Sequence, residues 1–93
     1  MDILKLKSYL RKGTVIFRFE KVDGTIREMN GTLSKEFIGD ENLPKGDSIA
    51  PSRNDNILVV FDVDASGWRS CRIENIKEVF DIELNEWIEF INE

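Results

Sequence analysis

The stretch TVIFRFEKVDGTIREMNGTL, residues 14–33, decides the fold class. Its first seven residues alternate between an apolar face and a mixed face, which is typical of a half-buried β-strand. The apolar face holds Val15, Phe17 and Phe19. Asp-Gly follows at residues 23–24, and this pair between two strand-like runs is a strong hairpin signal because both residues tolerate positive φ. The rest of the stretch predicts the return strand, with a β-bulge within residues 27–31 because Ile26 is out of phase with Met29.

A second hairpin is predicted in VFDVDASGWRSCRIENI, residues 60–76, together with the residues just before it. Both faces of the run 57–63 are apolar, so this strand is expected to be central in the sheet or covered on both sides. A turn at Asp64-Ala65-Ser66-Gly67 leads into a return strand that begins at Trp68. The remaining expected elements are a single helical turn at residues 74–76 and a short strand at residues 78–82.

Helical spacing occurs at both ends of the chain. Residues 1–12 carry apolar side chains at i, i+3 and i+7, which predicts a short N-terminal helix that ends at Gly13. Residues 83–93 follow the same rule and predict an amphipathic C-terminal helix. Its apolar positions are Leu84, Trp87, Ile88 and Ile91, with Phe90 beside them. This stripe is wider than one small barrel needs, so we expect a weak homodimer through the terminal helices.

Residues 34–56 show no clear period and contain both prolines of the chain. Phe37-Ile38 and Leu43 are expected to anchor the first half of this long loop. Long loops on a rigid scaffold often carry binding residues. Lys45 and Arg53 are therefore candidate partner contacts.

These elements predict a single mainly β domain over residues 1–93. We expect a small SH3-like barrel of about five antiparallel strands, because small barrels protect their strand edges by closing. The short N-terminal helix and the amphipathic C-terminal helix would cover what the barrel leaves open. A chain of 93 residues and 10.8 kDa has no room for a second core.

Composition excludes several classes of function. The chain has no histidine, which removes His-based catalytic and metal sites, and its single cysteine cannot form an internal disulfide. Asp62-x-Asp64-x-Ser66-Gly67 copies half of a calcium loop, but Ile73 stands where that loop needs glutamate. We therefore expect no enzyme activity, no metal and no cofactor. The net charge of −5 disfavours non-specific DNA binding, although the acidic groups concentrate in residues 54–93.

The strongest candidate site residues lie on the two hairpins. Trp68 and Arg72 share a strand face by spacing, and Arg69 lies between them. Arginine stacks on aromatic rings and binds phosphate in a bidentate manner, so Arg27 of the first hairpin could complete a nucleotide or acidic-peptide site. The alternative is an Arg–Trp stack that covers a barrel edge and pairs with Asp62 or Glu74. Cys71 is expected to be a buried, inert thiol.

The two hairpins resemble a family of small tailed-phage proteins described as SH3 β-barrel fold-containing. The segments that carry the resemblance are Ile26-Arg27-Glu28-Met29 and Gly67-Trp68-Arg69-Ser70-Cys71-Arg72, with Cys71 where an aromatic residue usually stands. The last hairpin is also similar, over a shorter stretch, to the end of WYL-type domains that sense nucleic-acid or nucleotide ligands. The resemblance implies a phage setting and hence the host bacterial cytoplasm.

Three hypotheses for function follow. The first is a non-enzymatic phage accessory protein that binds a host protein and inhibits a defence or nucleic-acid-processing factor, since a carboxylate face can occupy a basic channel. The second is a nucleotide-binding module that uses Arg27, Trp68, Arg69 and Arg72. The third is nucleic-acid binding through the basic N-terminal helix. No membrane partner is expected.

Overall fold

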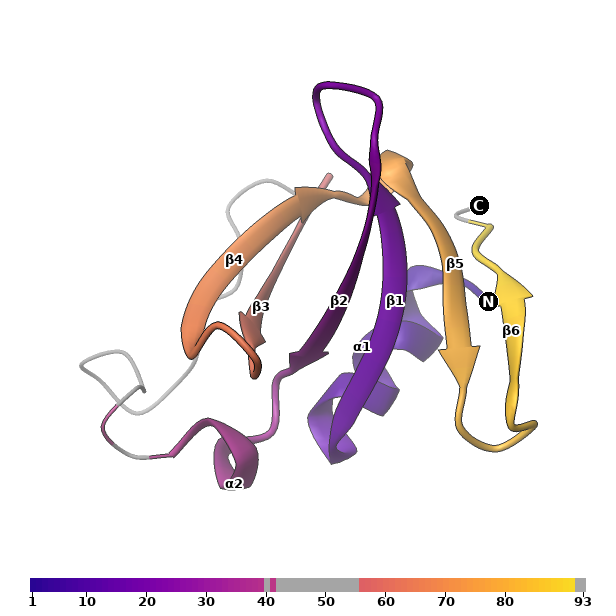
Figure 1. The fold of residues 1–93 in the computed structure, drawn as a ribbon. Coiled ribbons are helices and arrows are strands. Elements are labelled where there is room, and N and C mark those ends of the chain that lie inside the picture. Colours follow the sequence, from indigo (N-terminus) through magenta and orange to yellow (C-terminus); the bar gives the residue numbers. More distant parts are fainter. Residues whose placement is uncertain (40, 42–55, 92–93) are drawn as a thin grey trace.

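Six antiparallel strands form one curled sheet in the order β4-β3-β2-β1-β5-β6 (Figure 1). The computed structural model describes residues 1–39, 41 and 56–91, and the strands are counted within these residues. Their bounds are β1 Thr14–Glu20, β2 Ile26–Thr32, β3 Ile57–Asp62, β4 Gly67–Arg72, β5 Ile76–Asp81 and β6 Glu86–Glu89. The predicted mainly β, SH3-like class is confirmed, with six strands instead of five.

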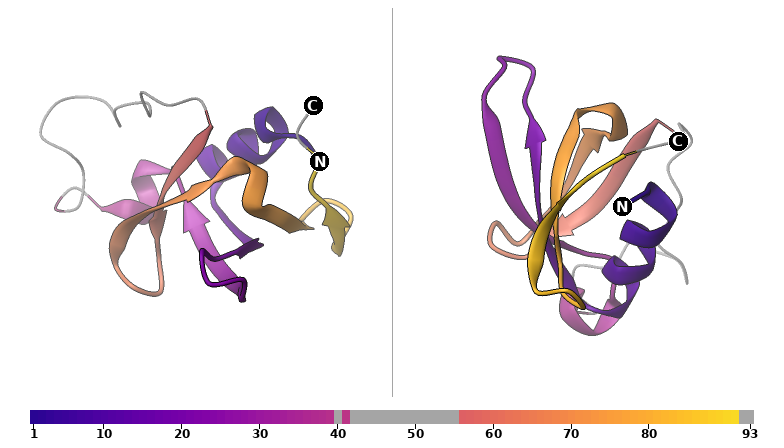
Figure 2. Two further views of the ribbon diagram at one scale, coloured as in Figure 1. Left: turned by 90° about the horizontal axis from the view of Figure 1, so that it is seen from above. Right: turned by 90° about the vertical axis from the view of Figure 1, so that its right-hand side faces the viewer.

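The predicted N-terminal helix is α1, Ile3–Lys12, and it lies across one face of the sheet (Figures 1 and 2). The side chain of Asp2 accepts a hydrogen bond from the Lys5 amide at 2.9 Å and caps the first turn. Gly13 ends the helix, as predicted. Leu6, Tyr9 and Leu10 are buried and join the inner-face side chains of the strands in one hydrophobic core. No helix in the described part of the chain is long and apolar enough to span a membrane.

Strands β1 and β2 form the predicted hairpin, which projects beyond the other strands (Figure 2). Gly24 adopts φ 88°, the left-handed conformation that this turn requires. The expected bulge in residues 27–31 is wrong, because pairing runs without interruption from Thr14↔Thr32 to Glu20↔Ile26. Ile26 lies on the outer face and is 54% exposed. It therefore does not belong to the alternating set of core-facing residues that includes Met29. The observed register shift lies between Arg18 and Phe19, toward β5.

A short helix, α2 (Lys35–Ile38), follows β2 and lies beside the end of α1. The prediction that Phe37-Ile38 anchors this segment holds for Ile38, which is buried, whereas Phe37 is 51% exposed. Most of the predicted 34–56 loop, including Leu43, lies outside the described residues.

The second hairpin consists of β3, a central strand as expected, and β4. Residues 63–66 form the turn, in which Ser66 adopts the left-handed conformation at φ 53°. The predicted one-turn helix is η2, Ile73–Asn75, and it leads directly into β5.

The C-terminal helix predicted over residues 83–93 is wrong: the chain turns back and pairs as β6 with β5. Asp81 holds the turn because its Oδ1 accepts hydrogen bonds from the amides of Glu83 and Leu84, at 2.9 and 3.1 Å. Asn85 completes the turn at φ 55°, a conformation that asparagine tolerates. The predicted homodimer interface was to use both terminal helices, and the C-terminal one is a strand.

Candidate functional site

The two hairpins line an open pocket of about 660 Å³ on the inner face of the curled sheet. Its walls come from the end of β1 and the following turn, from β2, from the start of β3, from β4 and from η2. This size falls within the range of about 300–1,000 Å³ that small-molecule sites usually have. The pocket therefore joins the two segments that the sequence marks most strongly.

The inner part of the pocket is apolar. Phe19, Met29 and Cys71 line it, and each is buried with at most 8% of its surface exposed. Phe19 packs at a tilt against Phe17 in the core, with 6.1 Å between ring centroids. The floor is thus continuous with the core and offers a flat or apolar group a fixed surface.

Cationic groups surround this floor in excess over acidic ones. The charged lining residues are Lys21, Arg27, Arg69, Arg72, Glu20 and Asp23. Asp23 is engaged within its own turn, since Thr25 donates to its Oδ1 from Oγ1 at 2.6 Å and from the amide at 3.0 Å. These two bonds, the hydroxyl first, hold the pKa of Asp23 below its usual value. Asp23 therefore stays charged, with its carboxylate hydrogen-bonded within the turn. With four cationic and two acidic residues in its lining, the pocket favours an anionic ligand.

Arg69 is the cation best placed to receive that anion. It lies opposite Val60 in the β3–β4 ladder, on the same strand face as Cys71. Its side chain is exposed, and within residues 1–39, 41 and 56–91 it makes no ion pair or hydrogen bond. An inward-directed guanidinium without a partner has all its donors available for a ligand.

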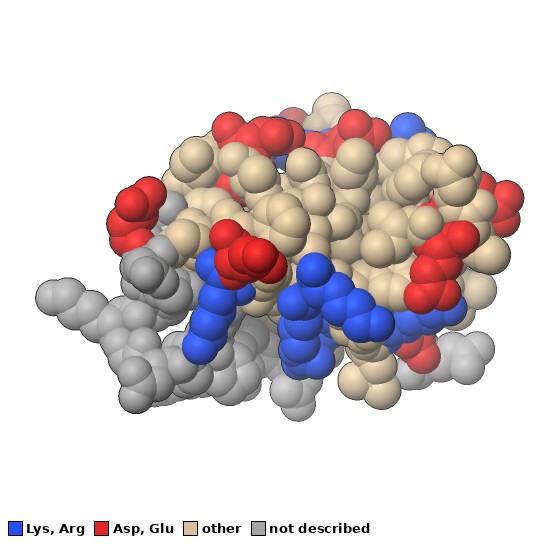
Figure 3. All heavy atoms as spheres, turned by 90° about the horizontal axis from the view of Figure 1, so that it is seen from below, with Lys and Arg blue, Asp and Glu red and all other residues tan. Residues whose placement is uncertain are grey.

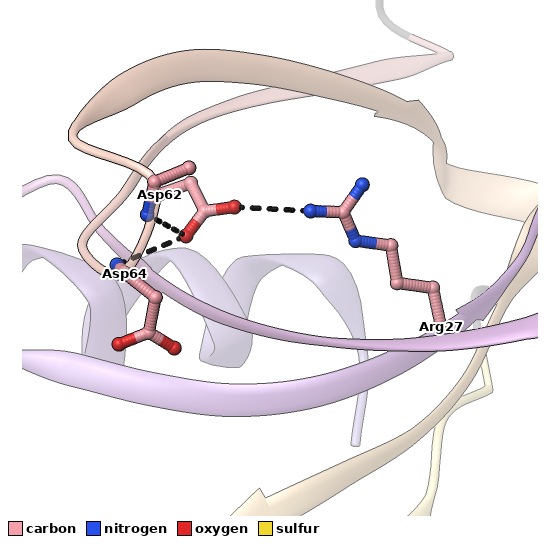
Figure 4. Close-up of polar contacts among 4 residues, drawn as sticks. Arg27, Asp62 and Asp64 are labelled. Carbon is pink, nitrogen blue, oxygen red and sulfur yellow. Dashed lines mark hydrogen bonds and ion pairs between the residues drawn. The ribbon is translucent and has the colours of Figure 1, made fainter.

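Arg27, on β2, is partly engaged by Asp62 at the end of β3 (Figure 4). The distance from Arg27 Nη2 to Asp62 Oδ2 is 3.5 Å, which is long for a charge-assisted hydrogen bond. Asp62 is 3% exposed, and its other oxygen accepts from the amides of Asp64 and Ala65 at 3.1 and 3.2 Å. The carboxylate thus braces the β3–β4 turn and orients Arg27 while using only one edge of the guanidinium.

Of the other predicted residues on β4, one reaches the pocket and one does not. Arg72 lines the pocket at its outer end and pairs with Glu74 at 3.5 Å, a contact exposed on both sides and hence weak. Trp68 shares the strand face of Arg72 but packs edge-on against Phe61, with 5.6 Å between ring centroids, and does not line the pocket. The two acidic partners named in the alternative prediction are both paired with arginines, Asp62 with Arg27 and Glu74 with Arg72. Lys45 and Arg53 lie outside the described residues.

Three residues that line the pocket are not among those predicted from the sequence: Phe19, Met29 and Lys21. The strand pattern around Phe19 and Met29 is the one expected for ordinary core residues. They line a pocket because the second hairpin faces them across the open end of the core. The strand register would have pointed to the pocket, because Phe19 pairs directly with the charged residue Arg27. A charged residue opposite an inner-face aromatic marks the place where the core opens to solvent.

Cys71, in the pocket floor, is the buried thiol that the sequence predicts. Burial raises the pKa of this thiol to about 11. It is therefore protonated at neutral pH. Because only the thiolate form is a nucleophile, Cys71 is not activated for nucleophilic attack. In the described part of the chain no cluster of His, Cys, Asp and Glu is arranged to hold a metal ion.

Comparison with known proteins agrees with this architecture. Residues 3–77, which include α1, both hairpins and η2, match the family WYL_2, described as an Sm-like SH3 beta-barrel fold. The chain belongs to the WYL_2 family. This WYL_2 chain is also 31% identical, over 90 residues, to an Enterobacteria phage T4 protein described as "Uncharacterized 11.5 kDa protein in Gp31-cd intergenic region". The match covers 97% of this chain and 86% of the phage protein, and no solved structure matches significantly. The predicted resemblance to small phage proteins with an SH3-like barrel is confirmed.

Proposed function

We propose that this WYL_2 protein acts without catalysis and that it binds a nucleotide in the pocket between its two hairpins. The observation that carries the proposal is Arg69: an inner-face guanidinium beside an apolar floor, with no partner among the described residues. A cation kept free at a pocket favours an anionic ligand.

The lining supports a ligand with two chemically different ends. Arg69, Arg27 and Lys21 favour a phosphate, which a guanidinium binds in a bidentate manner. Phe19, Met29 and Cys71 offer a base an apolar surface to lie on. Phosphate alone would leave this floor wet, and an apolar ligand alone would leave the cations unused. A nucleotide satisfies both.

A thermal-shift titration of the full chain with nucleoside mono-, di- and cyclic phosphates tests the proposal. At 100-fold excess over the dissociation constant, a ligand stabilises the folded state by about 2.7 kcal/mol. For a domain of this size that raises Tm by roughly 10 °C or more. No shift with any of these nucleotides would refute the proposal.

Arg69→Gln is the matched test of the site, and Lys77→Gln is its control. Lys77 is an exposed cation on β5 that does not line the pocket, so both variants lose one positive charge. A hydrogen bond to a charged group contributes about 1.5–3 kcal/mol, so Arg69→Gln should weaken nucleotide affinity about 10- to 150-fold. Lys77→Gln should bind within about twofold of the parent protein. Equal affinity of all three proteins would exclude Arg69 from the site.

A host-protein partner in the bacterial cytoplasm is the second candidate. It is favoured by the tip of the β1–β2 hairpin, where Val22 is fully exposed and Ile26 is 54% exposed. Apolar side chains at a projecting tip suit insertion into a partner's cavity. In a pull-down from bacterial lysate, the parent protein should enrich a host protein that the variant Val22→Asp/Ile26→Ser does not retain. Identical capture by both would exclude the tip.

A further inference from the structure

A second charged surface lies apart from the pocket, on the exposed side of α1 and on α2. Viewed from below, Lys and Arg side chains gather on the side of the molecule where these helices lie, with acidic groups around them (Figure 3). The sequence of α1, ILKLKSYLRK, carries four basic residues and no acidic one. In a chain with a net charge of −5, so local a concentration of positive charge calls for a physical reason.

Helix stability accounts for only part of this charge. Arg11 and Lys12 lie in the last turn of α1, where the helix dipole favours cations. Lys7 lies in the middle of the helix, where the dipole gives no such benefit. It also stands four residues before Arg11, and like charges at this spacing repel. Within the described residues, the side chains of Lys7, Arg11 and Lys12 form no ion pair.

An exposed aromatic ring adjoins these cations. Phe37, on α2, is 51% exposed. Its Cε2 lies 3.8 Å from the position that a Cβ on Gly13 would take, so the ring rests beside the residue that follows Lys12. A large apolar side chain next to unpaired cations is what proteins use to bind unpaired bases, which stack on the ring while the cations contact the phosphates.

We infer that the surface formed by Lys7, Arg11, Lys12 and Phe37 binds single-stranded nucleic acid. A lipid surface fits less well, because an interfacial helix needs a wide free apolar face. The apolar face of α1 is buried in the core through Leu6, Tyr9 and Leu10, which leaves Leu4 as its exposed large apolar residue. Duplex DNA would use the cations but would leave Phe37 without a base to stack on. The surface is independent of the nucleotide pocket and can be tested separately.

Fluorescence anisotropy of a labelled oligothymidylate with the full chain is the experiment. Contact with three phosphates predicts a slope of log affinity against log salt near −2, from about −0.7 per contact on single strands. Affinity should then fall about 18-fold between 50 and 200 mM salt. Lys7→Gln/Arg11→Gln should weaken binding at least tenfold and reduce the slope to about −0.7. Lys77→Gln, which removes an exposed positive charge outside both this surface and the pocket, should leave both the affinity and the slope unchanged.

Phe37→Ala tests the stacking part of the inference. Loss of one stacked base should weaken binding about 5- to 150-fold, whereas it should leave the salt slope unchanged. Circular dichroism confirms that each variant is folded. The inference is overturned if the parent protein does not bind the oligonucleotide at low salt, or if Lys77→Gln loses as much affinity as Lys7→Gln/Arg11→Gln. Binding to anionic vesicles alone, or wild-type affinity in Phe37→Ala, overturns it as well. Arg69→Gln should bind the oligonucleotide normally, which separates this result from that for the pocket.

Discussion

Thr32→Val should destabilise the protein strongly although it barely changes the shape of the side chain. Thr32 ends β2 and is completely buried. Its Oγ1 lies 2.7 Å from the carbonyl oxygen of Gly13 and 3.2 Å from that of Leu10, and it accepts a bond from the Ser34 amide at 3.0 Å. One hydroxyl thereby joins the end of α1 to the end of β2 and to the start of α2.

The magnitude follows from the number of groups left unpaired. A hydroxyl has one hydrogen, so it donates to the closer carbonyl, that of Gly13, and accepts from Ser34. Valine removes both bonds and leaves a buried amide without a partner, and an unsatisfied buried group costs about 1–3 kcal/mol. We expect a loss of about 2 kcal/mol in the free energy of unfolding, equivalent to a fall in Tm of about 8–16 °C.

Thr32→Ser is the matched control, because it keeps the hydroxyl and loses only a buried methyl group. That loss costs about 0.8 kcal/mol, so serine should be the milder substitution. Urea unfolding followed by circular dichroism measures both variants. A Thr32→Val protein within about 0.5 kcal/mol of the parent, or one more stable than Thr32→Ser, would show that the Thr32 hydroxyl does not hold these elements together.

Two further predictions concern titratable groups. Because burial raises the pKa of Cys71 to about 11, iodoacetamide should alkylate the native thiol on the order of 100-fold more slowly than a free cysteine near pH 8. The contribution of the protonated thiol to the free energy of unfolding should disappear as the pH rises through the raised pKa. Equal rates for native and urea-unfolded protein would contradict this. Burial disfavours the Asp81 carboxylate, but the amides of Leu84 and Glu83 outweigh it and hold its pKa below the ordinary 3.8. The folded state is therefore stabilised above that pH and loses this contribution as the pH falls, so urea unfolding of Asp81→Asn between about pH 6 and 2 should show a shallower decline than that of the parent. Parallel declines would exclude Asp81.

Local sequence signals were enough to predict most of the fold. The Asp-Gly pair before Thr25 and the period-two pattern around Phe17 both act over short distances, and both hairpins form as expected. The C-terminus was missed because a short apolar set fits two periods at once. Trp87 faces outward against Phe80 and under the guanidinium of Arg18, at 5.6 and 3.8 Å from the two groups. These contacts come from neighbouring strands, and no local pattern in residues 83–93 reports them.

The candidate site was predictable in its cations but not in its shape. Arg27 and Arg69 were assigned because arginines on two neighbouring hairpins suit phosphate, and both line the pocket. Spacing places Trp68 on the same strand face as Arg72, but its ring packs against Phe61 and does not line the pocket. Which face of a strand opens to solvent depends on how the sheet curls, and this is a property of the whole barrel.

The most direct test of nucleotide binding is an NMR titration of the ¹⁵N-labelled full chain with adenosine monophosphate. If a nucleotide binds the pocket, saturable shifts are expected at the amides of Phe19, Arg27, Arg69 and Cys71, and none on the exposed side of α1. Saturable shifts at α1 alone, or none at the pocket at millimolar nucleotide, would contradict nucleotide binding in the pocket.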